Sequence, residues 1–265
     1  MPSKTNTATA PIMENENVIE LLSILKANQS PSLNDFNAML GHIIAMEMRL
    51  AEAVKELAAM RRDLAEAQKY NHPIKNAMQK AVIAMQVHVL EMREKLAELK
   101  TAFIDGCKNA LAAFKEKGIS ALDNIARFFK IKPLLEAVHT GADKAAQSAD
   151  RAVSNIEAAS KRYHEAEMHI KNAGRALSGK EILTEAKDPG MIAKTFSTPF
   201  RATRFCFKGI RNNAVAAVGK LNRLEERAAE KKPSIKKTME DFNKQIKEAE
   251  RDTPERTKAR PDPAL

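Results

Sequence analysis

Residues 134–177 read LLEAVHTGADKAAQSADRAVSNIEAASKRYHEAEMHIKNAGRAL, and this stretch decides the fold. Its apolar residues recur at alternating spacings of three and four, from Leu135 through Ile156 to Leu177. A strand requires alternation by two, whereas a spacing that averages about 3.5 is the seam of a helix lying along another helix. The stretch therefore predicts one long helix, and its many alanines favour a close antiparallel partner.

Two earlier stretches, at 40–64 and 78–103, show the same spacing of three and four and are each predicted to form a helix. The break at residues 71–73, Asn-His-Pro, is short, so we expect these two helices to pack antiparallel on each other. Aromatic residues make up 5% of the chain and Trp is absent, which favours slender groups of helices over a thick globular core. The predicted fold is all-α, an elongated coiled-coil-like bundle of antiparallel helical hairpins. The two seams are Leu40, Ile43, Glu47, Leu50, Val54, Leu57, Arg61 and Leu64, and then Met78, Val82, Met85, Val89, Met92, Leu96, Leu99 and Phe103.

Composition shifts and helix breakers divide the chain into five predicted parts. The Pro-containing tail has mixed charge and few apolar residues, which is typical of disorder. The last predicted helix, 234–250, carries its own stripe of apolar residues, Ile235, Met239, Phe242, Ile246 and Ala249. The parts are a disordered leader (1–12), an N-terminal helix followed by a long hairpin (13–118), a short amphipathic connecting helix (119–132), a second hairpin with the C-terminal helix (133–250) and the disordered tail (251–265).

Neither a secretory signal nor a membrane-spanning stretch is evident. The N-terminus is polar, and the most apolar window, 81–90, is too short to cross a bilayer. Cys107 and Cys206 are far apart in the sequence and form no CxxC pair. We therefore expect a soluble cytoplasmic protein with two reduced thiols.

The sequence holds no catalytic signature. The nearest approach to a zinc motif is His164-Glu165-Ala166-Glu167-Met168-His169, whose histidines are five residues apart. A zinc-binding HExxH requires them four apart, so that both project from one helical face. No phosphate-binding loop or nucleophile motif is present. We therefore expect no enzymatic activity, no cofactor and no metal.

The strongest functional signal is electrostatic. Between Pro189 and Leu224 there is no Asp or Glu, and this acid-free segment carries +7 of the formal net charge of +10. A basic helix with interleaved phenylalanines suits an anionic surface. Alternatively, its phenylalanines pack onto the alanine seam while its cations pair with carboxylates elsewhere in the chain. The candidate contact residues are Lys194, Arg201, Arg204, Lys208, Arg211, Lys220 and Arg223.

These observations favour a non-enzymatic helical scaffold or interaction protein whose basic helix, about 189–224, contacts an anionic protein partner. Sequence-independent binding of DNA or RNA is an alternative, and peripheral attachment to an anionic membrane surface is another. The seams also permit a homo-oligomer, because apolar seam residues do not distinguish pairing within a chain from pairing between chains.

Several short motifs together resemble a known family. The chain is similar to a family of uncharacterised helical proteins, a domain of unknown function, from gut Firmicutes and often linked to integrative conjugative elements. The resemblance covers nearly the whole chain and implies a bacterial accessory protein of a mobile element, without any catalytic or cofactor-binding residue to transfer. The motifs are GCKNA at 106–110, AFKEKG at 113–118, SALD at 120–123, ARFFKIKP at 126–133, YHEA at 163–166, GRA at 174–176, GKE at 179–181 and KPSIKKTM at 232–239.

Overall fold

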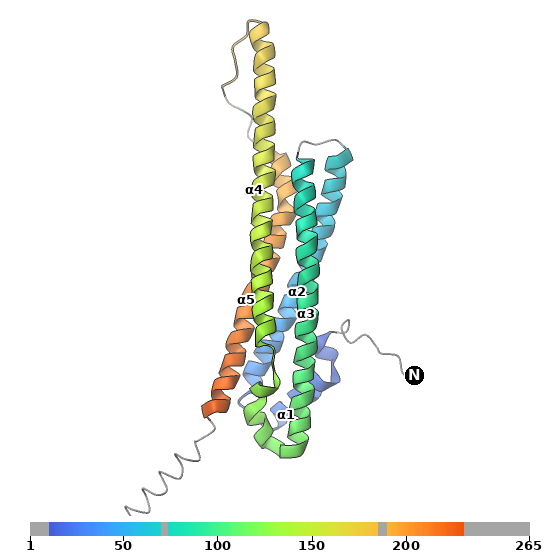
Figure 1. Cartoon of the computed structure of the whole chain (residues 1–265), viewed down its shortest axis with the longest axis vertical. Helices are drawn as coiled ribbons and strands as arrows, with labels where there is room; N and C mark the ends of the chain where they lie inside the picture. The colour runs from blue at the N-terminus through green and yellow to red at the C-terminus, as the bar shows by residue number, and fades with distance from the viewer. Residues whose placement is uncertain (1–10, 70–73, 185–189, 231–265) are drawn as a thin grey trace, which may run out of the picture.

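The computed structural model describes residues 11–69, 74–184 and 190–230, and these contain no β-strand. The predicted all-α class is confirmed. Four long helices lie side by side and alternate in direction, with a short helix at one end (Figure 1). The elements are η1 (Ile12–Glu14), α1 (Glu16–Ala27), α2 (Leu33–Lys69), α3 (Lys75–Lys117), η2 (Gly118–Phe128), α4 (Lys132–Leu177) and α5 (Gly190–Glu230).

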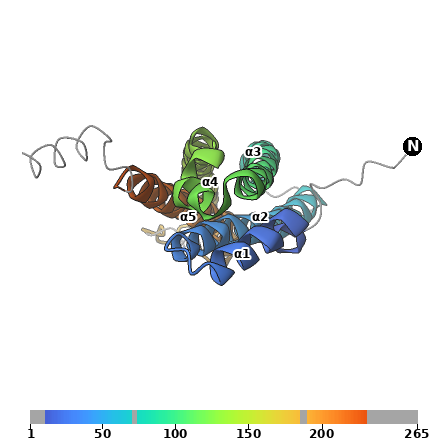
Figure 2. The same cartoon turned by 90° about the horizontal axis from the view of Figure 1, so that it is seen from below.

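The four long helices form one bundle. The helix α5 contacts both α2 and α4 extensively, while α3 contacts α4 and, less extensively, α2. Figure 2 looks along the bundle from the end at which α1 packs against α3 and α2. The hairpin partner α3 is therefore a weaker neighbour of α2 than α5, which is distant in the sequence.

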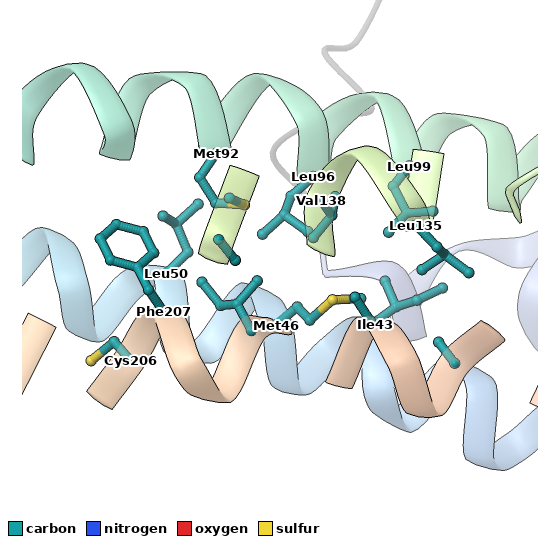
Figure 3. Packing of buried hydrophobic residues seen from close by; sticks show 14 of the residues in the cluster. Ile43, Met46, Leu50, Met92, Leu96, Leu99, Leu135, Val138, Cys206 and Phe207 are labelled. Atoms are coloured by element: carbon teal, nitrogen blue, oxygen red, sulfur yellow. The ribbon is translucent and has the colours of Figure 1, made fainter. Parts of the chain in front are cut away.

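A single hydrophobic core runs through both predicted hairpins. In Figure 3, Met46 and Leu50 from α2 meet Leu96 from α3, Val138 from α4 and Phe207 from α5. All of these side chains are buried. Because each helix contributes one apolar stripe to the same core, the two hairpins are halves of one packing unit.

The predicted seam of α3 is buried throughout, and the predicted seam of α4 is buried from Leu135 to Ile156. The methionines of α3 are core residues, as their spacing predicts. The predicted seam of α2 was wrong at alternate positions. Met46, Ala53 and Met60 are buried where Glu47, Val54 and Arg61 were expected. Glu47 instead lies beside the seam, where its carboxylate pairs with Lys100 of α3 at 3.4 Å.

The ends of the predicted parts differ from the structure in two places. Ile12, which the sequence placed in a disordered leader, is buried in η1. The connecting amphipathic helix ends earlier than expected: it is a 3-10 helix, Gly118–Phe128, with Leu122 and Ile125 buried, in which Asn124 leaves helical geometry (φ −117°, ψ 31°). Pro199 lies inside α5, which runs from Gly190 to Glu230. The predicted leader before residue 11, the last helix at 234–250 and the tail at 251–265 lie outside the described residues.

A tight turn at the foot of the bundle depends on one glycine. Gly118 ends α3 with a φ of +62°, a conformation that glycine adopts without strain, and the chain then folds back through η2. Phe129 enters the core between Phe36 and Phe103, with ring centroids 5.6 and 5.2 Å away. A Cβ at Gly106 would lie 2.5 Å from the Phe129 ring, so only glycine allows this approach.

We predict that Gly106→Ala lowers the free energy of unfolding by about 1–3 kcal/mol, the usual cost of overpacking a filled core. The matched control is Gly41→Ala, on an exposed helical position where a Cβ would meet nothing within 4 Å. That change should raise stability by about 0.5–1 kcal/mol through helix propensity. Urea denaturation of both variants measures the difference, and equal effects would contradict the packing argument.

Candidate functional site

The acid-free helix α5 lies with one flank against the acidic flank of α4. Arg204 donates to Asp150 at 2.6 Å, and Arg211 donates to Asp143 at 3.0 Å. Arg201 pairs with the next carboxylate along α4, Glu157. The three acidic residues are seven apart, so they share one helical face and form a charge ladder along the α4–α5 contact.

The lower part of α5 makes a second contact with the chain's own carboxylates. Asp35 lies in the first turn of α2 and is 4% exposed. Lys220 approaches it to 3.5 Å and Arg227 to 2.8 Å. The Oδ2 atom of Asp35, which lies nearest Arg227, accepts no hydrogen bond from the described residues. The interaction between Arg227 and Asp35 is therefore an ion pair without a well-aligned hydrogen bond. The carboxylate also lies at a helix N-terminus, where negative charge is favoured.

Three of the seven candidate contact residues make no ion pair with any described residue. These are Lys194, Lys208 and Arg223, of which Lys208 is half-buried and the other two are exposed. The other four candidates, Arg201, Arg204, Arg211 and Lys220, face α4 or α2.

The phenylalanines of the acid-free helix belong mainly to the core. Phe200 and Phe207 are fully buried, and Phe196 packs against the core. The fourth, Phe205, is exposed, with the Arg49 guanidinium 5.4 Å above its ring. The arrangement matches the alternative in which the aromatic residues pack internally and most of the cations are already paired.

The ladder also perturbs one titration. The hydrogen bond from Arg211 holds the pKa of the Asp143 carboxyl below its usual value, and Gln147 and His139 act in the same direction. A carboxyl whose pKa is lowered by folding stabilises the folded state above its unfolded pKa. That contribution is lost as the pH falls through the lowered pKa.

We predict that carbon-detected NMR gives Asp143 a titration midpoint below the unperturbed value of about 3.9. Arg211→Gln should raise the midpoint, because it removes the hydrogen bond and the charge. Lys208→Gln, on the same helix but outside the ladder, should leave the midpoint nearly unchanged. If Arg211→Gln left the titration midpoint of Asp143 unchanged, the pairing of Arg211 with Asp143 would be contradicted.

Neither cysteine has the surroundings of a nucleophile. Burial raises the pKa of the Cys107 thiol to about 12. Burial, and next the nearby Glu52 carboxylate, raise the pKa of Cys206 to about 11. Reactive thiols have a lowered pKa and partial exposure, so both residues are core side chains.

We predict that neither thiol of the native protein reacts readily with a thiol reagent at pH 8, because the thiolate is the attacking species. Both should react once the chain is unfolded in denaturant. A Val215→Cys variant supplies an exposed control thiol on α5 that should react rapidly. Fast labelling of native Cys107 or Cys206 would show that its burial is not persistent.

The histidine motif holds no metal geometry. His164 lies 3.6 Å from Glu167, a contact along one helix, while His169 is exposed. Within the described ranges, no three His, Cys, Asp or Glu side chains are grouped as metal ligands. None of the described helices has an apolar stretch long enough to cross a membrane.

We did not predict from the sequence that α4 extends beyond the helices that pack against it. Its seam is buried at Ala149 and Ile156 but exposed from Tyr163 onward, with Ile170 74% exposed and Leu177 92% exposed. Figure 1 shows this end of α4 extending past the other long helices. We call residues 160–177 the projecting end. The sequence signal for this end is that α4 has more residues after Glu157 than α5 has before Arg201. The two helices are antiparallel, α5 begins at Gly190, and Arg201 pairs with Glu157. No residues of α5 are therefore left to cover the last turns of α4.

The projecting end is held in shape by the loop that follows it. The Asn172 side chain donates to the Leu183 carbonyl at 2.8 Å and accepts from the Leu183 amide at 2.7 Å. Ser178 caps the helix by donating to the Gly174 carbonyl at 2.9 Å, and Gly179 turns the chain with a φ of +65°. The exposed seam is therefore part of an ordered helix with a defined surface.

Two hollows mark the α3–α4 face of the bundle. The lower hollow, of about 760 Å³, lies between residues 88–98 of α3 and 136–144 of α4. The upper hollow, of about 530 Å³, lies between residues 76–84 and 148–162. Ala77 and Ala84 line the upper hollow from α3, and buried Gly141 lines the lower hollow from α4. We call the surface between α3 and α4 that contains these two hollows the groove.

Taken together, these observations define an antiparallel α-helical bundle with an exposed apolar stripe at the end of α4 and two hollows between α3 and α4. The chain belongs to the family of unknown function DUF6674, whose family model matches residues 14–261. The expected resemblance to an uncharacterised family is confirmed at this level. No curated protein and no solved structure matches the chain.

Proposed function

We propose that this protein is a non-enzymatic helical scaffold that binds a partner protein through the projecting end of α4. The observation that carries the proposal is the seam itself, which keeps its spacing of three and four after it leaves the core. Tyr163, Ile170 and Leu177 occupy positions equivalent to buried Ala149 and Ile156. An apolar stripe of this kind gains free energy only when another helix covers it.

The partner surface expected from this stripe is an amphipathic helix with apolar residues at heptad spacing. The projecting end carries both signs of charge, and part of that charge is already paired, as between Lys171 and Glu167. Its surface is therefore suited to apolar contact more than to a strongly charged ligand. The exposed Ile182 and Leu183 of the return loop extend the apolar area beside the helix.

The acid-free helix gives weaker support to an anionic partner. Of the seven candidate contact residues, Lys194, Lys208 and Arg223 are the three that can contact such a partner without breaking an ion pair to a described residue. Their span of about 29 residues spreads them over roughly 45 Å of helix. We retain contact with nucleic acid, or with an anionic membrane surface, as alternatives that rest on these three residues. The resemblance to proteins of conjugative elements supports a further proposal, an accessory role for a bacterial mobile element.

We predict that Ile170→Glu weakens binding of the partner by at least about tenfold, because it puts a charge into an apolar helix contact. The partner is first identified by a photo-crosslinking residue placed at 177 in the native host, and is then purified. Calorimetry with the purified pair compares Ile170→Glu with Val215→Glu, which introduces the same charge at an exposed apolar position of α5. Val215→Glu should leave the affinity unchanged.

Three results would contradict the proposal. One is equal affinity of the wild type and Ile170→Glu for the purified partner. Another is dimerisation of the chain alone that Ile170→Glu abolishes, since the seam would then serve a second copy. The third is a salt-sensitive complex with DNA or RNA at about 50 mM salt that Lys194→Glu, Lys208→Glu and Arg223→Glu together remove, which would favour nucleic-acid binding.

A further inference from the structure

The two flanks of α4 differ in how their charges are satisfied. On the flank that faces α5, Asp143, Asp150 and Glu157 are all paired. On the flank that faces the groove, Lys144 and Arg151 form no ion pair within the described part of the chain. The groove therefore presents charge that the four-helix bundle does not neutralise.

The groove is also polarised along its length. The lower hollow has Glu91, Glu94, Glu98 and Glu136 against Lys95 and Lys144, a formal net charge of −2. Among these acids only Glu91 has a described ionic contact, with His88. The upper hollow has Lys80, Arg151 and Arg162 and no acid, a formal net charge of +3.

Exposed apolar side chains of α3 lie beside the two hollows, next to the residues that line them. Val87 lies seven residues after Lys80 of the upper hollow and seven before Glu94 of the lower one, so all three share one helical face. Ile83, Val87 and Leu90 are all about half exposed. A helix with one apolar stripe, basic at its start and acidic at its end, would fit this surface.

We propose that the chain's own segment 234–250 docks in the α3–α4 groove as a fifth helix of the bundle. Its apolar residues Ile235, Met239, Phe242 and Ile246 have the heptad spacing of the groove. Residues 231–239 hold four lysines and no acid, a charge of +4, while residues 240–250 hold four acids and two lysines, a charge of −2. When the segment runs parallel to α4, its basic start meets the acidic lower hollow and its acidic end approaches Lys144 and Arg151.

The length and starting point of the segment suit this path. Lys132, at the start of α4, donates to Asn222 at 2.9 Å and lies 4.0 Å from Glu225, so α5 passes the foot of α4 and its last residue, Glu230, lies about 7–12 Å beyond it. The five residue steps from Glu230 to Ile235 can span about 16–18 Å, which is enough to make this return and to cross one helix of about 10 Å diameter. A helix over 234–250 is about 25 Å long, the distance from Lys132 to Ser148 on α4.

This placement gives each part of the segment a definite neighbour. Lys236 and Lys237 lie level with the unpaired Glu98 and Glu136. In this placement Phe242 would lie level with Gly141, and Ile246 would lie level with the exposed Leu90. The match to the family model extends to residue 261, so the segment belongs to the same family domain as the bundle.

The first test is disulfide trapping in the full-length protein. Met239→Cys is combined with Ala137→Cys, an exposed position that lines the lower hollow. The matched control combines Met239→Cys with Val215→Cys on α5. Val215 stands at nearly the same height but on another face, since Asp143 pairs with Arg211. The buried native thiols remain in place, and mass spectrometry identifies the linked peptides in the monomer fraction.

We expect the 137–239 disulfide to form on the order of tenfold faster than the 215–239 disulfide, because docking raises the effective concentration of one thiol at the other. Adding Glu98→Lys and Glu136→Lys should remove most of this advantage, and Lys236→Glu with Lys237→Glu should restore it. High salt should reduce the rate, because these charges are solvent-accessible.

Hydrogen exchange gives a second measurement that needs no added cysteine. Amides within 234–250 of the wild type should be protected at low salt, and Glu98→Lys with Glu136→Lys should remove that protection. Equal trapping at 137 and 215, or no protected amides in the segment, would overturn the proposal. A 137–239 disulfide found only between two chains would also overturn it, because the groove would then accept the segment of a second copy.

Discussion

The close packing of α4 against α5 is the interaction on which the rest of the molecule depends. Along this contact the α4 seam consists of alanines such as Ala142, Ala145 and Ala149, all fully buried. The helix α5 also contributes fully buried alanines, Ala214 and Ala217. Small residues let the two backbones approach closely, so the larger side chains of α2 and α3 can fill the remaining space from the opposite side. The result is a core without thick aromatic layers, consistent with a chain that has no Trp.

Electrostatics fixes the relative position of these two helices along their axes. A seam of alanines is nearly uniform along its length, and a uniform seam specifies register poorly. The charge ladder on the flank is not uniform, because Asp143 and Asp150 each meet one arginine. Exposed ion pairs contribute little free energy individually. Their contribution here is to make alternative registers, in which like or unpaired charges would meet, less favourable.

The sequence predicted the fold class, and the bounds of α4 to within two residues, because spacing, prolines and glycines act locally. It mistook Glu47 for a seam residue of α2 because the seam can continue from Ile43 either three residues on, at Met46, or four residues on, at Glu47. Which of the two is buried depends on the helices that pack against α2. It could not foresee that α5 is the main neighbour of α2, since contacts between distant helices leave no local pattern. The seven basic residues were found, but the carboxylates that neutralise Arg204 and Arg211 lie more than fifty residues away.

The length of α4 beyond Ser160 also sets a distance. The helix continues for about 17 residues, or roughly 25 Å at 1.5 Å per residue, and Asn172 ties its end to the returning chain. A molecule bound near Leu177 would therefore be held at a fixed distance from the bundle. Shortening or lengthening this helix by whole heptads would alter the reach of the molecule while preserving the direction in which the seam faces.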